Sequence, residues 1–149
     1  MERSVTGTIE RTKRGDYQRF QAISTRWMDN DVYGHVNNVV YYSWFDTAVN
    51  RLLVVNGLLD IHGGKTIGLV AETGCRYFSP TAFPDEIQAG VRVAHLGDSS
   101  VRYEIGLFRN NEEDAAAVGY FVHVYVDRET KRPVSVDAKM RGFLEGMKI

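Results

Sequence analysis

The stretch that decides the fold runs from residue 37 to residue 57 and reads NNVVYYSWFDTAVNRLLVVNG. Apolar side chains recur in it at spacings of four and three residues, which is typical of one face of a helix: Tyr41, Phe45, Ala48, Leu52 and Val55. Neighbouring apolar residues widen that face, so only a narrow polar strip is left for solvent. Asn37 or Asn38 can cap the first turn, and Gly57 supplies a stop. We therefore expect a helix of about 18 residues, roughly 27 Å long, that other structure covers.

Four segments after this helix have the length and alternation of strands, and they span residues 67–79, 85–96, 101–109 and 115–127. Strands in succession suggest an antiparallel meander. One apolar set in each of the last three should point to a common face: Ile87/Ala89/Val91/Val93, Val101/Tyr103/Ile105/Leu107 and Val118/Tyr120/Val122/Val124/Val126. A further strand is expected within residues 17–27, and a short helix after Pro133. The pattern predicts an α+β domain whose antiparallel sheet packs over the helix.

The composition is that of an ordinary soluble globular protein. The 149 residues favour a single domain over residues 1–149. The balance of 18 basic against 19 acidic residues lacks the positive field that nucleic acid requires. Cys75 is the one cysteine, so no intramolecular disulfide can form, which fits a reducing compartment. Residues 1–15 hold no apolar leader, and no run approaches the roughly 20 apolar residues of a spanning helix. We expect a cytoplasmic protein without nucleic-acid or membrane partners.

Unusual polar residues crowd the loop before the helix: Arg26, Asp29, Asp31, Gly34, His35, Asn37 and Asn38. The first N–H groups of a helix have no partner within it, and the helix dipole places partial positive charge there. A polarised carbonyl would be stabilised at that position. A carboxylate a few residues upstream could then act on the carbonyl as a nucleophile or as the base for a water. The alternative interpretation is that these side chains only form turns and caps.

The pattern Arg26-x-x-Asp29-x-Asp31-x-x-Gly34-His35-Val36-Asn37-Asn38-x-x-Tyr41 resembles the signature of hotdog-fold acyl-CoA thioesterases, in the 4-hydroxybenzoyl-CoA thioesterase branch. The resemblance covers almost the whole chain. It implies an antiparallel five-stranded sheet wrapped around one long central helix. It also implies homodimers, or tetramers built from dimers, with acyl-CoA sites at the interface. The implied reaction is hydrolysis of an acyl-CoA, or of an acylated carrier protein, to a carboxylic acid and the free thiol, without a metal or bound cofactor.

The resemblance also implies roles for individual residues. Asp31 matches the catalytic aspartate, and the backbone N–H of Asn38 stands where the thioester carbonyl is polarised. Asp29 matches a first, less decisive acid. Four further positions are implied in orienting the loop or contacting the substrate: Gly34, His35, Asn37 and Tyr41. An aspartate suits the reaction because its ordinary pKa, about 3.9, leaves it ionised at neutral pH.

Two other functions stay open on the sequence. A hydratase or dehydratase acting on enoyl or hydroxyacyl thioesters can use the same fold. A noncatalytic protein could use the polar loop only to bind an acyl thioester. Cys75 lies in a predicted strand without an evident base, so we expect a buried thiol and not a nucleophile. The histidines are far apart in the sequence, and we expect no metal site.

Overall fold

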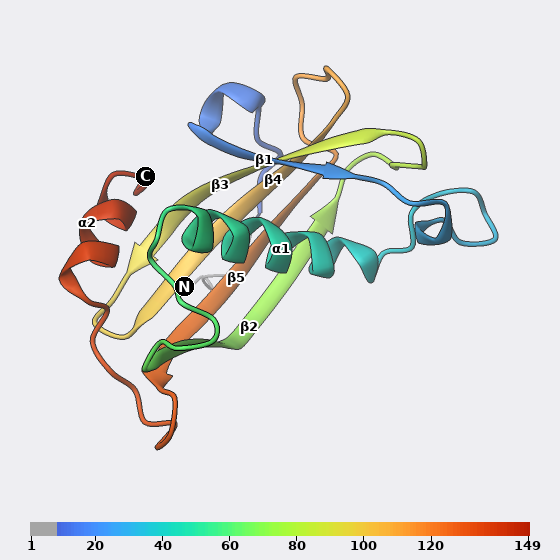
Figure 1. Cartoon of the computed structure of the whole chain (residues 1–149). Helices are drawn as coiled ribbons and strands as arrows, with labels where there is room; N and C mark the ends of the chain where they lie inside the picture. Colours follow the sequence, from blue (N-terminus) through green and yellow to red (C-terminus); the bar gives the residue numbers. More distant parts are fainter. Residues whose placement is uncertain (1–8) are drawn as a thin grey trace, which may run out of the picture.

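A five-stranded antiparallel sheet carries one helix across its face in the computed structural model, which describes residues 9–149 (Figure 1). The strands are β1 (Arg19–Ser24), β2 (Thr66–Tyr77), β3 (Glu86–Leu96), β4 (Ser100–Arg109) and β5 (Ala117–Asp127). The α-helices are α1 (Val40–Val55) and α2 (Ala138–Glu145), and short 3₁₀ helices span Arg14–Asp16 and Trp27–Asp29. Residues 1–8, part of the stretch in which no leader is expected, lie outside the described part. The α+β class predicted from the sequence is confirmed.

The strand order corrects the predicted meander. The order is β1-β3-β4-β5-β2, so only β3, β4 and β5 follow one another as neighbours. Strand β2 pairs with β5 from one end to the other, and β3 has β1 on its remaining side. The connection over residues 78–85 must therefore carry the chain from one edge of the sheet towards the other. This connection passes the start of α1, where the candidate site lies.

Helix α1 is shorter than predicted, with 16 residues or about 24 Å. It begins at Val40 after Val39, and no side chain caps it. The predicted asparagine cap is thus wrong in position, because Asn37 Oδ1 accepts the Val39 N–H (3.0 Å) in the turn before the helix. Gly57 ends the helix as predicted, with φ +70° and with the Leu58 N–H bonded to the Leu53 carbonyl. Val55, assigned above to the apolar face, is 70% exposed.

The apolar face of β5 was also assigned wrongly. Phe121 and Tyr125, not the predicted even-numbered set, belong to the core cluster that includes the buried face of α1. Gly119 lies so close to Phe45 of α1 that a side chain there would collide with its ring. Val118 instead packs on the outer side of the sheet, where the chain before β1 covers it. Both faces of β5 are buried, and the predicted sets on β3 and β4 do face α1.

The C-terminal helix α2 closes the end of the sheet away from the start of α1 (Figure 1). Asp137 caps it by accepting the Met140 N–H, and Met140 and Leu144 are buried. No helix in residues 9–149 has the length and apolar character needed to cross a membrane.

Candidate active site

The loop before α1 is built around Asp29, which is buried with 1% of its surface exposed. Its carboxylate accepts three hydrogen bonds from Arg26: one from the backbone N–H (2.7 Å) and two from the guanidinium (3.0 and 2.8 Å). Its own carbonyl accepts the Asn37 N–H (2.9 Å), which ties the end of the loop to its beginning. Asp29 therefore holds the loop together, and its oxygens are occupied by that task.

Asp31 has a different environment, because it is partly exposed at the start of a tight turn. Its Oδ1 accepts the Tyr33 N–H (2.8 Å), and its backbone N–H donates to the His35 carbonyl (2.8 Å). Gly34 makes the turn possible with φ +84°, a value that residues with a side chain rarely adopt. Within residues 9–149 no donor reaches the second carboxylate oxygen, Oδ2. The turn thus uses one oxygen of Asp31 and leaves the other free.

A cavity of about 300 Å³ opens beside the start of α1. It is lined by His35, Val36, Asn38, Tyr41, Tyr77, Phe78, Ser79 and Pro80. Three predicted site residues, His35, Asn38 and Tyr41, therefore meet at one place. The others do not line the cavity: Asp31 and Gly34 form the neighbouring turn, and Asn37 bonds the Val39 N–H.

The Asn38 peptide lies just before the first turn of α1. In the part of the chain that the structure describes, its N–H donates no hydrogen bond. Its carbonyl accepts the Tyr41 N–H and the Tyr77 hydroxyl (2.8 Å). A free N–H just ahead of a helix, where the dipole adds partial positive charge, can stabilise an oxygen that gains negative charge.

Two tyrosines, Tyr41 and Tyr77, line the cavity. The Tyr41 ring is 4.9 Å from that of Tyr77, edge to face, and its hydroxyl is 2.7 Å from Thr81 Oγ1. Burial raises the pKa of both tyrosines, so they stay neutral at physiological pH. The sequence did not point to Tyr77 and Thr81. Both are far along the chain from residues 26–38, called the signature loop below, and no local pattern marks them.

Cys75 is not activated as a nucleophile. Burial raises the pKa of the Cys75 thiol to about 12, which opposes formation of the nucleophilic thiolate. Within residues 9–149, no three His, Cys, Asp or Glu side chains lie close enough together to hold a metal ion. The polar groups at the cavity and its neighbouring turn include Asp31, His35 and the Asn38 peptide.

Comparison with known proteins identifies the family. The sequence model of the Thioesterase-like superfamily matches residues 25–144, which include the signature loop and all elements from α1 to α2. The chain belongs to this superfamily. A crystal structure of the PA5185 protein from Pseudomonas aeruginosa is similar to it, with 53% identity over 93% of this chain and 97% of that one, and a TM-score of 0.90.

Two further proteins are similar to this chain, one in structure and one in sequence. The DHNA-CoA thioesterase of Staphylococcus aureus has a TM-score of 0.73 at 19% identity, over 85% of either chain, a likeness that concerns the fold alone. The protein YsmA of Bacillus subtilis is 26% identical over 117 residues, which are 78% of this chain and of that protein. The predicted membership of a hotdog thioesterase family is confirmed.

Proposed function

We propose that this thioesterase-like protein hydrolyses an acyl-CoA to a carboxylic acid and free CoA, with Asp31 and the Asn38 N–H as its catalytic groups. The free Asn38 N–H at the mouth of an aromatic cavity is the observation that carries this proposal. A thioester carbonyl seated there would be polarised, and the charge that develops on its oxygen would be stabilised. The free Oδ2 of Asp31 supplies the second requirement, a carboxylate oxygen that the fold does not use.

Two routes from these groups balance chemically. As a base, Asp31 takes a proton from water while the hydroxide adds to the carbonyl carbon; the C–S bond then breaks and the thiolate takes up a proton. As a nucleophile, its carboxylate displaces the thiolate to form an acyl anhydride, which water then hydrolyses. Both routes place the negative charge on the oxygen that faces Asn38. His35 and Tyr41 line the cavity and would contact the acyl group, while Gly34 and Asn37 keep the turn and the following peptide in place.

The test measures free thiol released from a panel of short, long, branched and aromatic acyl-CoAs, and from acylated carrier protein. In Asp31→Asn the side-chain oxygen can still accept the Tyr33 N–H, so the turn should persist while the charge is lost. We expect turnover to fall by at least about 10²-fold. Asp127→Asn is the matched control, because Asp127 is also partly exposed and accepts a backbone N–H two residues ahead, from Glu129 (2.9 Å).

Three outcomes would contradict the proposal. Equal turnover by Asp31→Asn and wild type would remove Asp31 from the reaction. Reversible hydration of crotonyl-CoA without release of thiol would indicate a hydratase instead. Saturable binding without turnover of any thioester would indicate a noncatalytic binding protein.

We further propose that a second copy of the chain completes the site, as homodimer or dimer-based tetramer. Strand β2 is at the edge of the sheet, and Leu69 and Val70 on it are 43% and 50% exposed. Large apolar side chains also stand out from the signature loop: Trp27, Met28, Val32 and Tyr33, at 77, 74, 94 and 84% exposed. Exposed apolar groups beside an unpaired edge are typical of an interface. Sedimentation that shows a stable, fully active monomer would contradict this.

A further inference from the structure

The connection between β2 and β3 braces the signature loop from the side. Its Thr81, fully buried, makes two of the contacts: its carbonyl accepts the Val36 N–H (2.8 Å), and its hydroxyl is 2.7 Å from that of Tyr41. Farther along, the Phe83 N–H donates to Asn30 Oδ1 (3.1 Å). Asn38 lies between Val36 and Tyr41, so a single residue anchors the chain on both sides of the peptide that faces the cavity.

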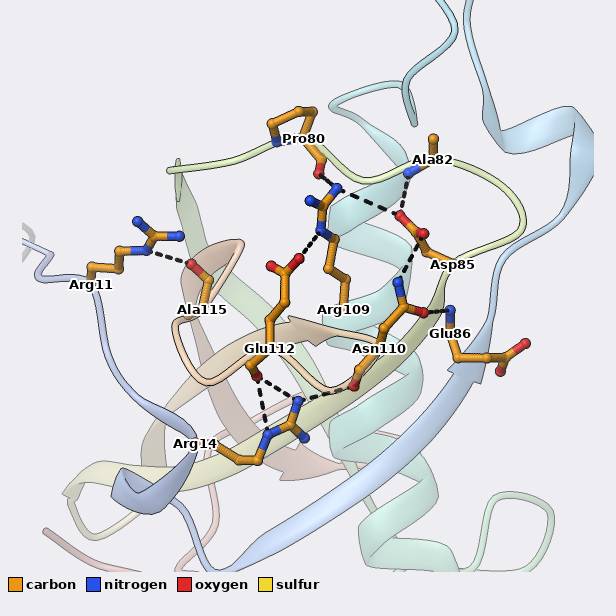
Figure 2. A network of polar contacts seen from close by, with 10 residues as sticks. All are labelled: Arg11, Arg14, Pro80, Ala82, Asp85, Glu86, Arg109, Asn110, Glu112 and Ala115. Atoms are coloured by element: carbon orange, nitrogen blue, oxygen red, sulfur yellow. Dashed lines mark hydrogen bonds and ion pairs between the residues drawn. The ribbon is translucent and has the colours of Figure 1, made fainter.

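Arg109, at the end of β4, holds this connection in turn (Figure 2). Its Nη1 donates to the Pro80 carbonyl (2.9 Å), and its Nε donates to Glu112 Oε2 (2.7 Å). The guanidinium is also 3.9 Å from Asp85, whose carboxylate accepts the Ala82 N–H at 3.0 Å. The Arg109 side chain is 33% exposed, so part of its charge is shielded from solvent.

Building on the function proposed above, we propose that Arg109 is a positioning residue for hydrolysis, which fixes the Pro80–Thr81 segment and through it the Asn38 peptide. Few contacts separate Arg109 from Asn38. The guanidinium donates to the Pro80 carbonyl, and the next residue, Thr81, contacts Val36 and Tyr41. Asn38 lies between these two residues in the chain. A displacement of about 1 Å in a group that stabilises the transition state can cost 10²-fold in rate. Asp29 holds the loop from within and Tyr77 bonds the Asn38 carbonyl, and the Pro80–Thr81 segment adds the contacts that fix Val36 and Tyr41 on either side.

The geometry of these contacts requires an arginine. Two different nitrogens of the planar guanidinium donate to Glu112 and to the Pro80 carbonyl. The two hydrogen bonds together fix the orientation of the group. A lysine carries the same charge on a single nitrogen at the end of a flexible stem. Arg109→Lys should therefore keep the ion pair with Glu112 and lose the hold on the Pro80 carbonyl.

The experiment compares Arg109→Lys with Arg141→Lys in the full-length protein. Arg141 is the matched control, because its Nη2 also bonds backbone carbonyls, those of Gly97 (2.8 Å) and Asp98 (3.1 Å), but on the β3–β4 hairpin. With a hydrolysed acyl-CoA, kcat of Arg109→Lys should fall about 10- to 100-fold while KM changes less than about threefold. Arg141→Lys should keep the wild-type kcat. Amide hydrogen exchange at Val36 should quicken at least about tenfold in Arg109→Lys alone.

A double variant separates positioning from general loss of stability. Thr81→Val removes the hydroxyl contact with Tyr41 at the next step of the chain. Both changes act through one segment. The kcat of the double variant Arg109→Lys/Thr81→Val should therefore be about as low as that of the more impaired single variant, and the two fold-losses should not multiply. Multiplicative losses, or equal losses in Arg109→Lys and Arg141→Lys, would overturn the proposal.

Amide hydrogen exchange at Val36 tests the positioning role of Arg109 without any need for catalytic turnover, because the Val36 N–H donates to the Thr81 carbonyl. If wild type hydrolyses no thioester, the proposed function fails, and Val36 exchange alone decides whether Arg109 braces the loop. Unchanged exchange at Val36 in Arg109→Lys overturns the bracing role whether or not the enzyme is active.

Discussion

Acidification should destabilise the protein through one buried histidine. His123 is on the face of β5 that packs against α1, and it is 2% exposed. Its Nδ1 is 3.2 Å from the Tyr125 hydroxyl, which is 2.8 Å from the Tyr103 hydroxyl. The Phe121 ring lies 4.6 Å from the His123 ring between centroids, tilted by 55°. Burial among these uncharged groups lowers the pKa of His123 from 6.5 to about 4.

The sign and size of the effect follow from proton linkage. In the unfolded chain the imidazole takes up a proton near pH 6.5, whereas in the folded protein it does so only near pH 4. Between these values the unfolded state binds more protons, so the free energy of unfolding falls as the pH falls. His123 should contribute a loss of about 1 kcal/mol at pH 6, about 2 kcal/mol at pH 5 and about 3 kcal/mol at pH 4, relative to pH 8.

Urea denaturation of wild type and His123→Asn at these four pH values isolates the contribution. Asparagine places an oxygen near the position of Nδ1, where it can accept from Tyr125, and it does not titrate in this range. Carboxylates titrate in both proteins, so their contribution cancels in the difference between the two curves. A difference that changes by less than about 0.5 kcal/mol from pH 8 to pH 5 would refute the assignment of His123 as a neutral buried base.

Three further outcomes are expected from single groups. Tyr125→Phe should cost about 2–4 kcal/mol of unfolding free energy and Tyr103→Phe about 1–2 kcal/mol. The first removes a partner from both Tyr103 and His123, whereas after the second the Tyr125 hydroxyl keeps its contact with His123; thermal unfolding that reverses this order would contradict the geometry. Gly119→Ala should cost about 1–3 kcal/mol in the same assay, because its methyl group meets the Phe45 ring, and wild-type stability would show that the contact can relax. Cys75 should react with a thiol reagent at pH 8 at least about 100-fold more slowly in the native protein than in urea, since a pKa of about 12 leaves little thiolate; equal rates would disprove its burial.

The elements of the fold could be predicted because their signals are local. The spacing of apolar residues from Tyr41 to Leu52 marks a helix in any sequence, and Gly57 ends it through a backbone angle that other residues avoid. Strands β3 and β4 likewise alternate cleanly, since one of their faces is buried and the other is partly exposed.

The face of β5 and the place of β2 could not be predicted, for physical reasons that differ. Strand β5 is buried on both faces, so alternation of apolar residues carries no information about which face meets α1. Gly119 marks the face of β5 that meets α1, because its lack of a side chain makes room for the Phe45 ring. The place of β2 depends on pairings formed with β5 some 50 residues later, a choice that no local pattern records.

Part of the candidate site can be predicted from the sequence, because the residues of the loop are neighbours along the chain. Gly34, His35 and Asn38 are close along the chain, and the turn that joins them is encoded within seven residues. Tyr77 and Thr81 reach the site only after β2 has crossed to the far edge of the sheet. The turn of the loop could therefore be predicted from the sequence, while the wall that shapes the cavity and the residues that brace the loop could not.

The two aspartates of the loop, Asp29 and Asp31, differ in how far their carboxylates are used by the fold. A carboxylate that accepts three hydrogen bonds in a buried setting, as Asp29 does, has no free electron pair directed at a substrate and would pull the loop apart if it moved. A carboxylate that is partly exposed and held through one oxygen, as Asp31 is, keeps its orientation and still offers the other oxygen. Under the proposed function, the reacting group is therefore expected at Asp31, the less satisfied position, while Asp29 gives the loop a fixed shape from which it could act.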